Sequence, residues 1–278
     1  MTGKTLRLKR LIRPGTGTSI IFAIDHGLTS PRLLKGLTKT RLRVEQAIAG
    51  GANVVLLSRG FARRVADVFR PDTSLGLMLT ASAAGHPEGS IITPIGSIEE
   101  ALRLGADAVA VFVALGQRNE DQMISYLSRV GEACAASGMP LLAEAEYPTT
   151  YMALDSLNDE FGPEYLKRNC RLCAELGADI IKTNWPGNVA DFAEIVESVD
   201  TPVVVAGGAR VSDLELLNRM AAARSVGAIG CSVGRNIFEH ERPDLITRAI
   251  TQVFEAGWSG QQAYEWLREA MAGGVECA

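Results

Sequence analysis

The stretch Ala178–Gly187 reads ADIIKTNWPG and joins a short apolar run to a lysine. Ile180 and Ile181 predict a buried strand, and Lys182 stands where that strand ends, shortly before a Pro-Gly turn. Lysine side chains are almost never buried without a reason. An apolar barrel mouth would disfavour the ammonium form, and the neutral amine can attack a carbonyl carbon to form a Schiff base. A lysine that extends from the strand end into solvent is the alternative, and this stretch leaves both open.

Short apolar runs alternate with longer amphipathic segments along the chain. The predicted strands cover residues 19–24, 53–57, 75–80, 108–113, 141–146, 180–182, 202–206 and 228–231. The predicted helices cover about 33–49, 98–104, 120–136, 163–176, 244–256 and 260–272. Continuously apolar runs are typical of parallel strands that are covered on both faces.

About eight strands, most of them followed by a helix, predict an α/β fold, a single (β/α)8 TIM barrel, which typically takes about 250 residues. Residues 1–278 would form one domain, with an N-terminal extension over about 1–17 and a C-terminal helix over about 259–273. A doubly wound sheet is the alternative. It usually has a glycine-rich loop after its first strand, whereas the glycine signals here follow the last two strands.

One phrase, Gly-Ala followed by Asn or Asp, precedes three of the predicted strands. It occurs at residues 51–53, 105–107 and 177–179, and Gly227-Ala228 is a partial fourth copy. Glycine closes a helix in the left-handed conformation, and the small residue lets helix and strand approach. Because these are helix-to-strand connections, we expect them at the end of the barrel that serves stability.

The composition and net charge limit the classes of function that the chain can have. The 278 residues are 47% hydrophobic with net charge −4, which suits a folded domain and argues against nucleic acid as the main partner. The basic cluster between Lys4 and Arg13 is expected to be a solvated face. No apolar run has the length of a signal peptide or a membrane span. We therefore expect a cytoplasmic protein without a membrane partner.

Neither cysteines nor histidines show the spacing of a metal site. Cys170 and Cys173 have C-x-x-C spacing but lie in a predicted helix, and no second pair completes a zinc site. The histidines, His26, His86 and His240, are far apart in the sequence. We expect reduced, packing cysteines, no metal and no cofactor.

Polar residues follow the predicted strands, at the end where barrels place their chemistry. Gly207-Gly208 follows the seventh strand, and Gly234-Arg235 follows the eighth, with a short helix starting near Arg235. Backbone N–H groups in such loops, together with an arginine, can bind an anion. We predict a phosphate site here, although a lone Gly-Gly pair is usually only a turn.

Asp25 and Tyr147 are the predicted acid–base residues. Tyr147 follows the fifth strand and Lys182 ends the sixth, so their side chains are expected to meet over the barrel mouth. The phenol is mostly protonated at neutral pH and suits proton donation, while holding the amine is the alternative role for Asp25. Glu146 alternates to the other side of the strand, and His26 is a candidate substrate contact. A packing role for Tyr147 and a simple ion pair for Asp25 are the alternatives.

Several motifs together resemble the archaeal-type class I fructose-bisphosphate aldolases. They are Asp25-His26-Gly27, Glu146-Tyr147-Pro148, Ile181-Lys182-Thr183-Asn184, Gly207-Gly208 and Gly234-Arg235-Asn236-Ile237-Phe238. The similarity covers roughly residues 15–270. That family belongs to the deoxyribose-phosphate aldolase-like superfamily, with relatives that include aminodideoxyheptulosonate synthase and a quorum-signal thiolase. The resemblance implies a Schiff base at Lys182, acid–base roles for Asp25 and Tyr147, phosphate binding at the two glycine loops, and a homo-oligomer.

We therefore expect a metal-independent class I aldolase, an aldehyde-lyase acting on a phosphorylated ketose, similar to fructose-bisphosphate aldolase. Thr149-Thr150 stands where the family often has Arg-Gly, and Trp185 where tyrosine is frequent, which leaves the aldehyde partner open. Alternatives are a transaldolase-like aminodideoxyheptulosonate synthase, and an acyl-transferring thiolase that acts on a phosphorylated diketone. The thiolase lacks the tyrosine, so Tyr147 favours aldol chemistry. A sugar-phosphate binding protein would not need Lys182.

Overall fold

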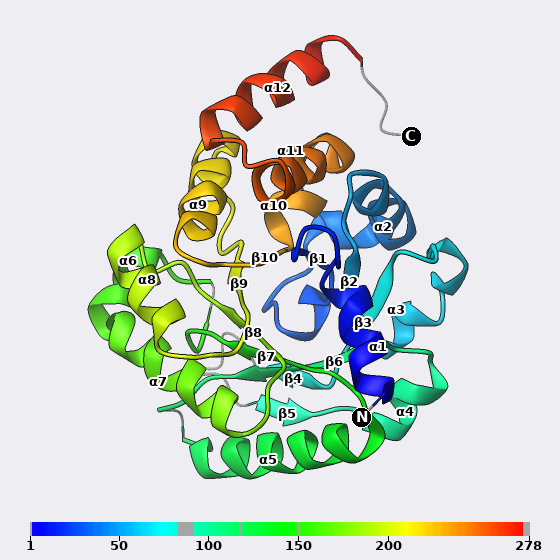
Figure 1. The fold of residues 1–278 in the computed structure, drawn as a ribbon, viewed down its shortest axis with the longest axis vertical. Coiled ribbons are helices and arrows are strands. Elements are labelled where there is room, and N and C mark those ends of the chain that lie inside the picture. Colours follow the sequence, from blue (N-terminus) through cyan, green and yellow to red (C-terminus); the bar gives the residue numbers. More distant parts are fainter. Residues whose placement is uncertain (1, 83–91, 117, 150, 275–278) are drawn as a thin grey trace.

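Eight parallel strands close into a barrel in the computed structural model, which describes residues 2–82, 92–116, 118–149 and 151–274 (Figure 1). The barrel strands are β1 (Ser19–Ala23), β2 (Val54–Leu57), β3 (Ser74–Met78), β6 (Ala108–Val113), β7 (Leu141–Ala145), β8 (Ile180–Thr183), β9 (Val203–Ala206) and β10 (Gly230–Val233). They follow one another around the barrel in the order β1-β10-β9-β8-β7-β6-β3-β2. The predicted TIM barrel is confirmed, and the doubly wound sheet is wrong. His86, Thr150 and Cys277 lie outside the described residues.

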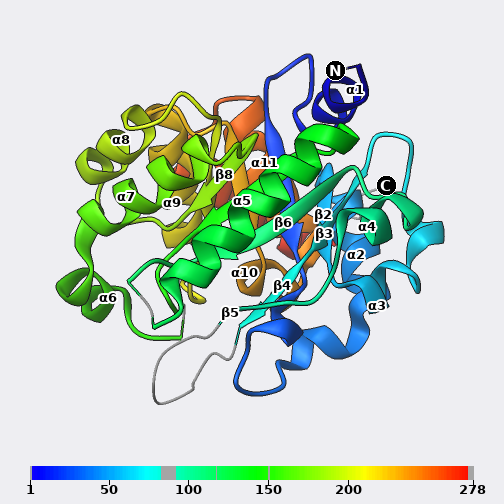
Figure 2. The same cartoon turned by 90° about the horizontal axis from the view of Figure 1, so that it is seen from below.

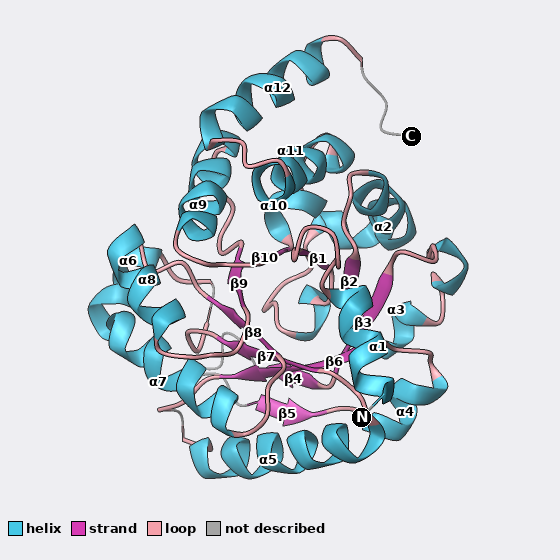
Figure 3. Cartoon of the chain, viewed as in Figure 1, coloured by secondary structure: helices cyan, strands magenta, loops and turns pink. Residues whose placement is uncertain are grey.

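Helices surround the strands (Figure 3). The α-helices are α1 (Thr2–Leu11), α2 (Thr40–Ala49), α3 (Arg59–Ala62), α4 (Ile98–Arg103), α5 (Glu120–Ser137), α6 (Leu154–Glu160), α7 (Gly162–Glu175), α8 (Val189–Glu197), α9 (Asp213–Ser225), α10 (Arg235–Phe238), α11 (Pro243–Glu255) and α12 (Gly260–Ala272). The 3-10 helices are η1 (His26–Leu28), η2 (Lys35–Lys39) and η3 (Ala66–Val68). The helix expected over 33–49 is divided between η2 and α2, and α1, α3, α6, α8 and α9 were not predicted.

The barrel strands bury apolar side chains on both faces. One buried cluster fills the barrel interior and includes Leu142 of β7, Ile180 of β8 and Leu11 of α1. A second, larger cluster packs between the strands and the helices, and it includes Ala143 and Ile181. Successive side chains of a strand point to opposite faces. Even-numbered residues of β7 and β8 therefore face the barrel interior, and odd-numbered residues face the helices. This alternation decides which side chains reach the site.

α1 covers the end of the barrel at which the strands begin (Figure 2). The Asx side chains of the three Gly-Ala-Asx phrases hold this end together. Each accepts a hydrogen bond from a backbone N–H at the start of a neighbouring strand. These bonds run from Ile20 N to Asn53 Oδ1 at 2.8 Å, from Leu75 N to Asp107 Oδ2 at 3.2 Å, and from Leu141 N to Asp179 Oδ2 at 2.9 Å.

The same Asx side chains bind α1. Lys4 pairs with Asp179 at 2.8 Å, Arg10 pairs with Asp107, and Asn53 Nδ2 donates to the carbonyl oxygen of Leu11 at 2.9 Å. The expectation that the N-terminal basic cluster is merely solvated is therefore wrong. Two of its cations, Lys4 and Arg10, meet carboxylates that the repeats place around the barrel end, although the Arg10 side chain stays 47% exposed.

The opposite end of the barrel carries the loops that follow the strands. The two-stranded hairpin of β4 (Thr80–Ser82) and β5 (Ile92–Pro94) lies at this end, far from α1 (Figure 2). β4 begins at Thr80, the last residue of the third predicted strand. Within the described part of the chain, no helix is both long enough and apolar enough to cross a bilayer.

Candidate active site

Lys182 points into the mouth of the barrel. In the pairing of β7 with β8 it lies opposite Glu144, on the face that Leu142 and Ile180 share. Its Nζ donates a hydrogen bond to Glu144 Oε1 at 2.9 Å and lies 2.9 Å from Glu146 Oε1. Lys182 is only 8% exposed. The alternative of a lysine that extends into solvent is therefore wrong.

The surroundings of Lys182 are strongly charged rather than apolar. Burial by itself lowers the pKa of Lys182, but the carboxylates of Glu144, Glu146 and Asp25 outweigh burial and hold that pKa above its usual range. Burial also raises the pKa of Asp25 to about 6 and that of Glu144 to about 8, against the opposing pull of the Lys182 charge. The expected apolar mouth is wrong, because three carboxyl groups surround the lysine and favour its ammonium form.

Asp25 and His26 line the same pocket as Lys182, as predicted for the loop after β1. The His26 ring meets Phe238 edge-on, with ring centroids 5.1 Å apart, and its Nδ1 lies 3.8 Å from Asp25 Oδ1. Burial, together with the charges of Lys182 and Arg235, lowers the pKa of His26 to about 3. The imidazole is therefore neutral, and it can contact a substrate without adding charge.

Gly234 has a packing reason beside its predicted anion-binding one. A Cβ at this position would lie 2.2 Å from Cε1 of His26 and 2.6 Å from the carbonyl oxygen of Ala23. No side chain fits there without displacing the histidine or strand β1. A glycine at this point is what allows His26 to sit in the pocket.

Asn236 joins the two predicted phosphate loops. Its Nδ2 donates to the carbonyl oxygens of Gly207 at 3.0 Å and Ala209 at 3.1 Å, and its Oδ1 accepts from Val211 N at 3.0 Å. In a trans peptide the N–H points away from the C=O. The N–H groups that follow these two carbonyls belong to Gly208 and Arg210, and they therefore point away from Asn236. The loops meet as predicted, while anion binding itself stays a prediction.

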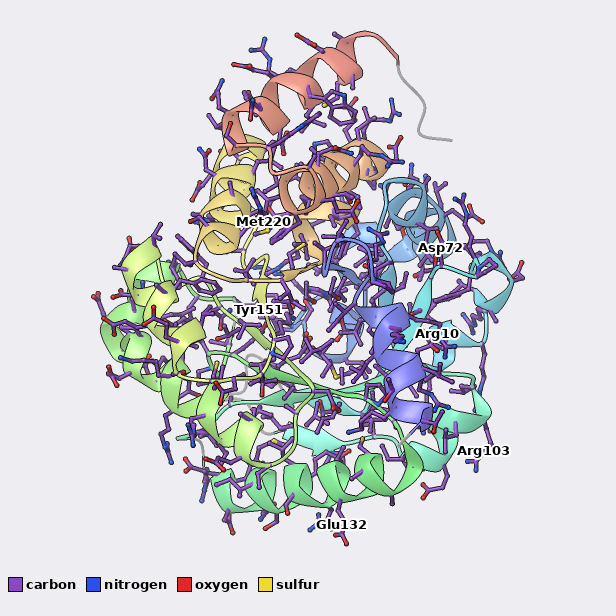
Figure 4. All side chains as sticks on the ribbon, viewed as in Figure 1. Arg10, Asp72, Arg103, Glu132, Tyr151 and Met220 are labelled. Atoms are coloured by element: carbon purple, nitrogen blue, oxygen red, sulfur yellow. The ribbon has the colours of Figure 1, made fainter. Side chains whose placement is uncertain are left out.

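Arg235 lies in a basic groove beside the lysine pocket. Its guanidinium carbon is 5.0 Å from the centre of the Tyr151 ring, a cation–π arrangement. The groove has a volume of about 1060 Å³, and its basic lining residues are Arg32, Lys35, Lys39, Arg43, Arg210 and Arg235. Tyr151 lines both this groove and the lysine pocket, so the two cavities adjoin at its side chain. Figure 4 labels Tyr151 near the centre of the view.

The structure does not bring Tyr147 to Lys182. Tyr147 follows Glu146 and belongs to the outer cluster between strands and helices, where its ring stacks on Tyr165 with centroids 6.0 Å apart. Its hydroxyl donates to Asn158 Oδ1 at 2.7 Å. The expectation that the Tyr147 and Lys182 side chains meet is wrong, because Glu146 takes the inward position at the end of β7 and the next residue must face outward.

Tyr147 and Asn158 instead connect the segments after β7 and β8. Asn158 Nδ2 donates to the carbonyl oxygen of Pro186 at 2.6 Å, and Asn184 Oδ1 accepts from the backbone N of Tyr147 at 2.7 Å. Burial raises the pKa of Tyr147 to about 12. The phenol therefore remains protonated and serves as a fixed hydrogen-bond donor between the two loops.

Sequence reasoning assigned no role to four residues that shape the site. Glu144, Tyr151 and Asn158 belong to none of the quoted motifs, and Asn236 lies in the Gly234–Phe238 motif without a role assigned to it. Strand alternation could have indicated Glu144, because it lies two residues after Leu142 and so points to the same, interior face of β7. Tyr151 lies in a loop, where no periodicity predicts direction. Among the described residues, no group of three or more His, Cys, Asp or Glu side chains is placed to hold a metal ion.

The chain is similar to known aldolases and synthases. A model of the DeoC/LacD family aldolases matches residues 19–240. The 2-amino-3,7-dideoxy-D-threo-hept-6-ulosonate synthase 1 of Archaeoglobus fulgidus is 32% identical over 273 residues, covering 98% of this chain and 99% of that protein. The 2-amino-4,5-dihydroxy-6-oxo-7-(phosphonooxy)heptanoate synthase of Streptomyces griseus is 34% identical over 251 residues, covering 90% and 89%.

A solved structure shares the fold. A Schiff-base-forming fructose-1,6-bisphosphate aldolase is 25% identical, with a TM-score of 0.79 over 90% of this chain and 99% of that one. The predicted resemblance is thereby confirmed at the level of the family. The chain belongs to the DeoC/LacD family of aldolases, enzymes that act on carbon–carbon bonds.

Proposed function

We propose that this protein is a class I aldolase in which Lys182 forms a Schiff base with a phosphorylated ketone. One observation carries the proposal. A buried lysine ends a barrel strand with a hydrogen bond of 2.9 Å to one carboxylate and a second carboxylate oxygen 2.9 Å away. A buried ammonium needs such partners, and the same partners can accept its proton when a ketone arrives.

Glu144 is the proton acceptor that frees the amine. Transfer of one proton from the Lys182 ammonium to Glu144 produces a neutral amine and a carboxylic acid, with no change in the total charge. The amine attacks the ketone carbon, and the acid returns its proton to the carbinolamine oxygen, which leaves as water. Asp25 lies in the same pocket, and its carboxylate stabilises the cationic iminium.

The basic groove suits the anionic part of the substrate. Arg235 and the N–H groups of the Gly207–Gly208 loop would hold the phosphate, as predicted from the sequence. Lys35 and Lys39 of η2 line the outer part of the same groove, where a second anionic group of the substrate could bind. The groove favours anions at both ends.

The direction of the reaction is proposed from the relatives. The names of the curated relatives describe synthases of seven-carbon 2-amino acids that carry a ketone. For a 4,5-dihydroxy-6-oxo-7-phosphonooxy skeleton, an enamine would form the bond between C4 and C5. Its two halves are then dihydroxyacetone phosphate and a four-carbon 2-amino aldehyde. We favour such a condensation, in which the acceptor brings a carboxylate to the basic groove, over cleavage of fructose bisphosphate.

Borohydride trapping tests the proposal. Treatment with dihydroxyacetone phosphate and borohydride should add the mass of the reduced adduct to the peptide that bears Lys182. Lys182→Ala and Lys182→Arg should abolish labelling and turnover, because arginine stays protonated. Lys167→Ala, on the outer helix α7, is the matched control and should keep both. Labelling at another lysine would refute the assignment.

A screen of aldehydes then identifies the acceptor. Aldehydes that carry a 2-amino acid group should be converted faster than glyceraldehyde 3-phosphate if the condensation proposal holds. Acyl transfer stays open as an alternative, because Tyr147 lies outside the lysine pocket and no longer argues against it. Conversion that requires coenzyme A would establish that alternative. A homo-oligomer and a cytoplasmic location stay predictions.

A further inference from the structure

Glu146 has an oxygen that the folded chain leaves without a hydrogen bond. Its side chain is 4% exposed, and Oε1 lies 2.9 Å from the Nζ of Lys182 but outside hydrogen-bonding angles. Among the described residues, this buried oxygen has no hydrogen-bond partner. A buried acceptor without a hydrogen bond calls for an explanation, a catalytic role among them.

The two glutamates at the end of β7 are not equivalent. Glu144 is committed to Lys182 by a hydrogen bond with good geometry. Glu146 stands two positions further along the strand, on the same inward face and closer to the mouth. It lines the lysine pocket together with Pro148 and Thr149 of the following loop. Its Oε1 is ion-paired with Lys182 but accepts no hydrogen bond, so it can accept one from a substrate hydroxyl group.

We infer that Glu146 carries the proton between the bound substrate's β-hydroxyl and its α-carbon, the task that was predicted for Tyr147. This inference rests on the proposed Schiff base at Lys182. It is supported by the alternation of β7, which places the carboxyl group rather than the phenol beside the reacting nitrogen.

Each step of the proton transfer balances. In the cleavage direction, the Glu146 carboxylate accepts the proton of the hydroxyl on the β-carbon. The oxygen's electrons form the carbonyl of the leaving aldehyde, and the broken carbon–carbon bond supplies the electrons of the enamine. The carboxylic acid of Glu146 then gives the proton to the enamine α-carbon and restores the iminium, which water hydrolyses. In the condensation direction the same steps run in reverse.

Tyr151 is the competing proton carrier in this pocket. Its phenol oxygen is also buried, and it has no hydrogen-bond partner among the described residues. Glu146 differs in lying within 2.9 Å of the reacting nitrogen. The experiment must therefore separate these two side chains.

Hydrogen exchange at the donor carbon measures this step directly. Dihydroxyacetone phosphate is incubated with the enzyme in D2O without an aldehyde, and loss of the α-proton is followed by NMR. In parallel, borohydride measures the Schiff base at Lys182. Glu146→Gln keeps the shape of the side chain and removes its basicity. We expect exchange to fall about 10²–10⁴-fold, the usual value of general acid–base catalysis, while trapping is retained. Tyr147→Phe, the neighbour on the opposite face, should exchange like wild type.

The outcomes separate this inference from the proposed function. Wild type that is never trapped refutes the Schiff base itself. If Glu146→Gln exchanges normally, or if it loses trapping as well, Glu146 does not act on the substrate proton. Loss of exchange in Tyr151→Phe with retention in Glu146→Gln assigns the step to the phenol. Should Glu146→Gln fold poorly, Glu146→Ala with added formate gives a second test, and the absence of any rescue of exchange would overturn the inference.

Discussion

The charge environment of Lys182 makes a quantitative prediction for Glu144→Gln. Two unit charges 2.9 Å apart attract by about 6 kcal/mol at an effective dielectric constant of about 20. One pKa unit corresponds to about 1.36 kcal/mol, so removal of the Glu144 charge could lower the pKa of Lys182 by about 4 units at most. Glu146 and Asp25 remain and will move toward the ammonium. We therefore expect a decrease of at least about 1 unit.

Competitive acylation measures this shift without a substrate. Acetic anhydride reacts only with the neutral amine, so the yield of acetylated Lys182 as a function of pH gives its pKa by peptide mass spectrometry. The Glu144→Gln midpoint should move to lower pH, since a carboxylate near an ammonium raises the ammonium's pKa. Glu132→Gln is the matched control, because Glu132 lies on α5 at the outer edge of the molecule (Figure 4).

Two results would refute this reasoning. An unchanged or higher midpoint in Glu144→Gln would mean that Glu144 does not hold the ammonium. A wild-type midpoint below the usual pKa of lysine, about 10.4, would mean that burial outweighs the carboxylates. The second result would restore the apolar mouth that the sequence suggested.

The remaining predictions concern Tyr147, the barrel end beneath α1, pH and metals. Tyr147→Phe should keep turnover, and it should lower the free energy of unfolding by about 0.5–1.5 kcal/mol in urea denaturation. A loss of turnover beyond about 100-fold would show that the phenol takes part in the chemistry. Asp179→Ala should lower that free energy by about 1–3 kcal/mol, because Leu141 N loses its acceptor, whereas exposed Asp200→Ala should have no measurable effect. Asp25 and Glu144 have folded pKa values of about 6 and 8, above their ordinary ones. The folded state therefore binds more protons than the unfolded chain between about pH 4 and 8, so these groups should make stability fall as pH rises through that range, and Glu144→Gln should flatten the fall in a denaturation series. EDTA should leave turnover unchanged, because the iminium takes the role of a Lewis acid; activity lost to EDTA and regained with zinc would contradict the mechanism.

The fold was predictable because its signals are periodic and local. The apolar runs, the amphipathic segments and the Gly-Ala-Asx phrases recur, and each recurrence supports the same barrel. α1 was missed because its partners are distant in sequence. Lys4 meets Asp179 and Arg10 meets Asp107 only after the barrel has closed, so no local pattern predicts that this basic segment packs against the protein.

The predicted residues Asp25, His26 and Lys182 line one pocket, whereas Tyr147 lies outside it and Glu146, its neighbour, lies inside it. Motif resemblance directed attention to Tyr147, while the period of the strand favours Glu144 and Glu146. Ile180 and Lys182 point to the same face of β8, and their partners in β7, Leu142 and Glu144, point to that face as well. The strand pairing with Lys182 therefore predicts that Glu144 and Glu146 face the lysine and that Tyr147 faces away from it. Tyr151 lies in a loop, where only coordinates could place it.

The charges of the two cavities determine how a phosphorylated ketone must enter. The lysine pocket holds the carboxyl groups of Asp25, Glu144 and Glu146, whereas six basic residues and one acidic residue, Glu239, line the adjoining groove. A phosphate dianion would be repelled by the first cavity and attracted by the second, so we expect it to bind near Arg235. The ketone of the proposed substrate would then extend past Tyr151 toward Lys182. A neutral His26 at the boundary leaves this separation of charge intact, and the separation orients the substrate before any bond is made.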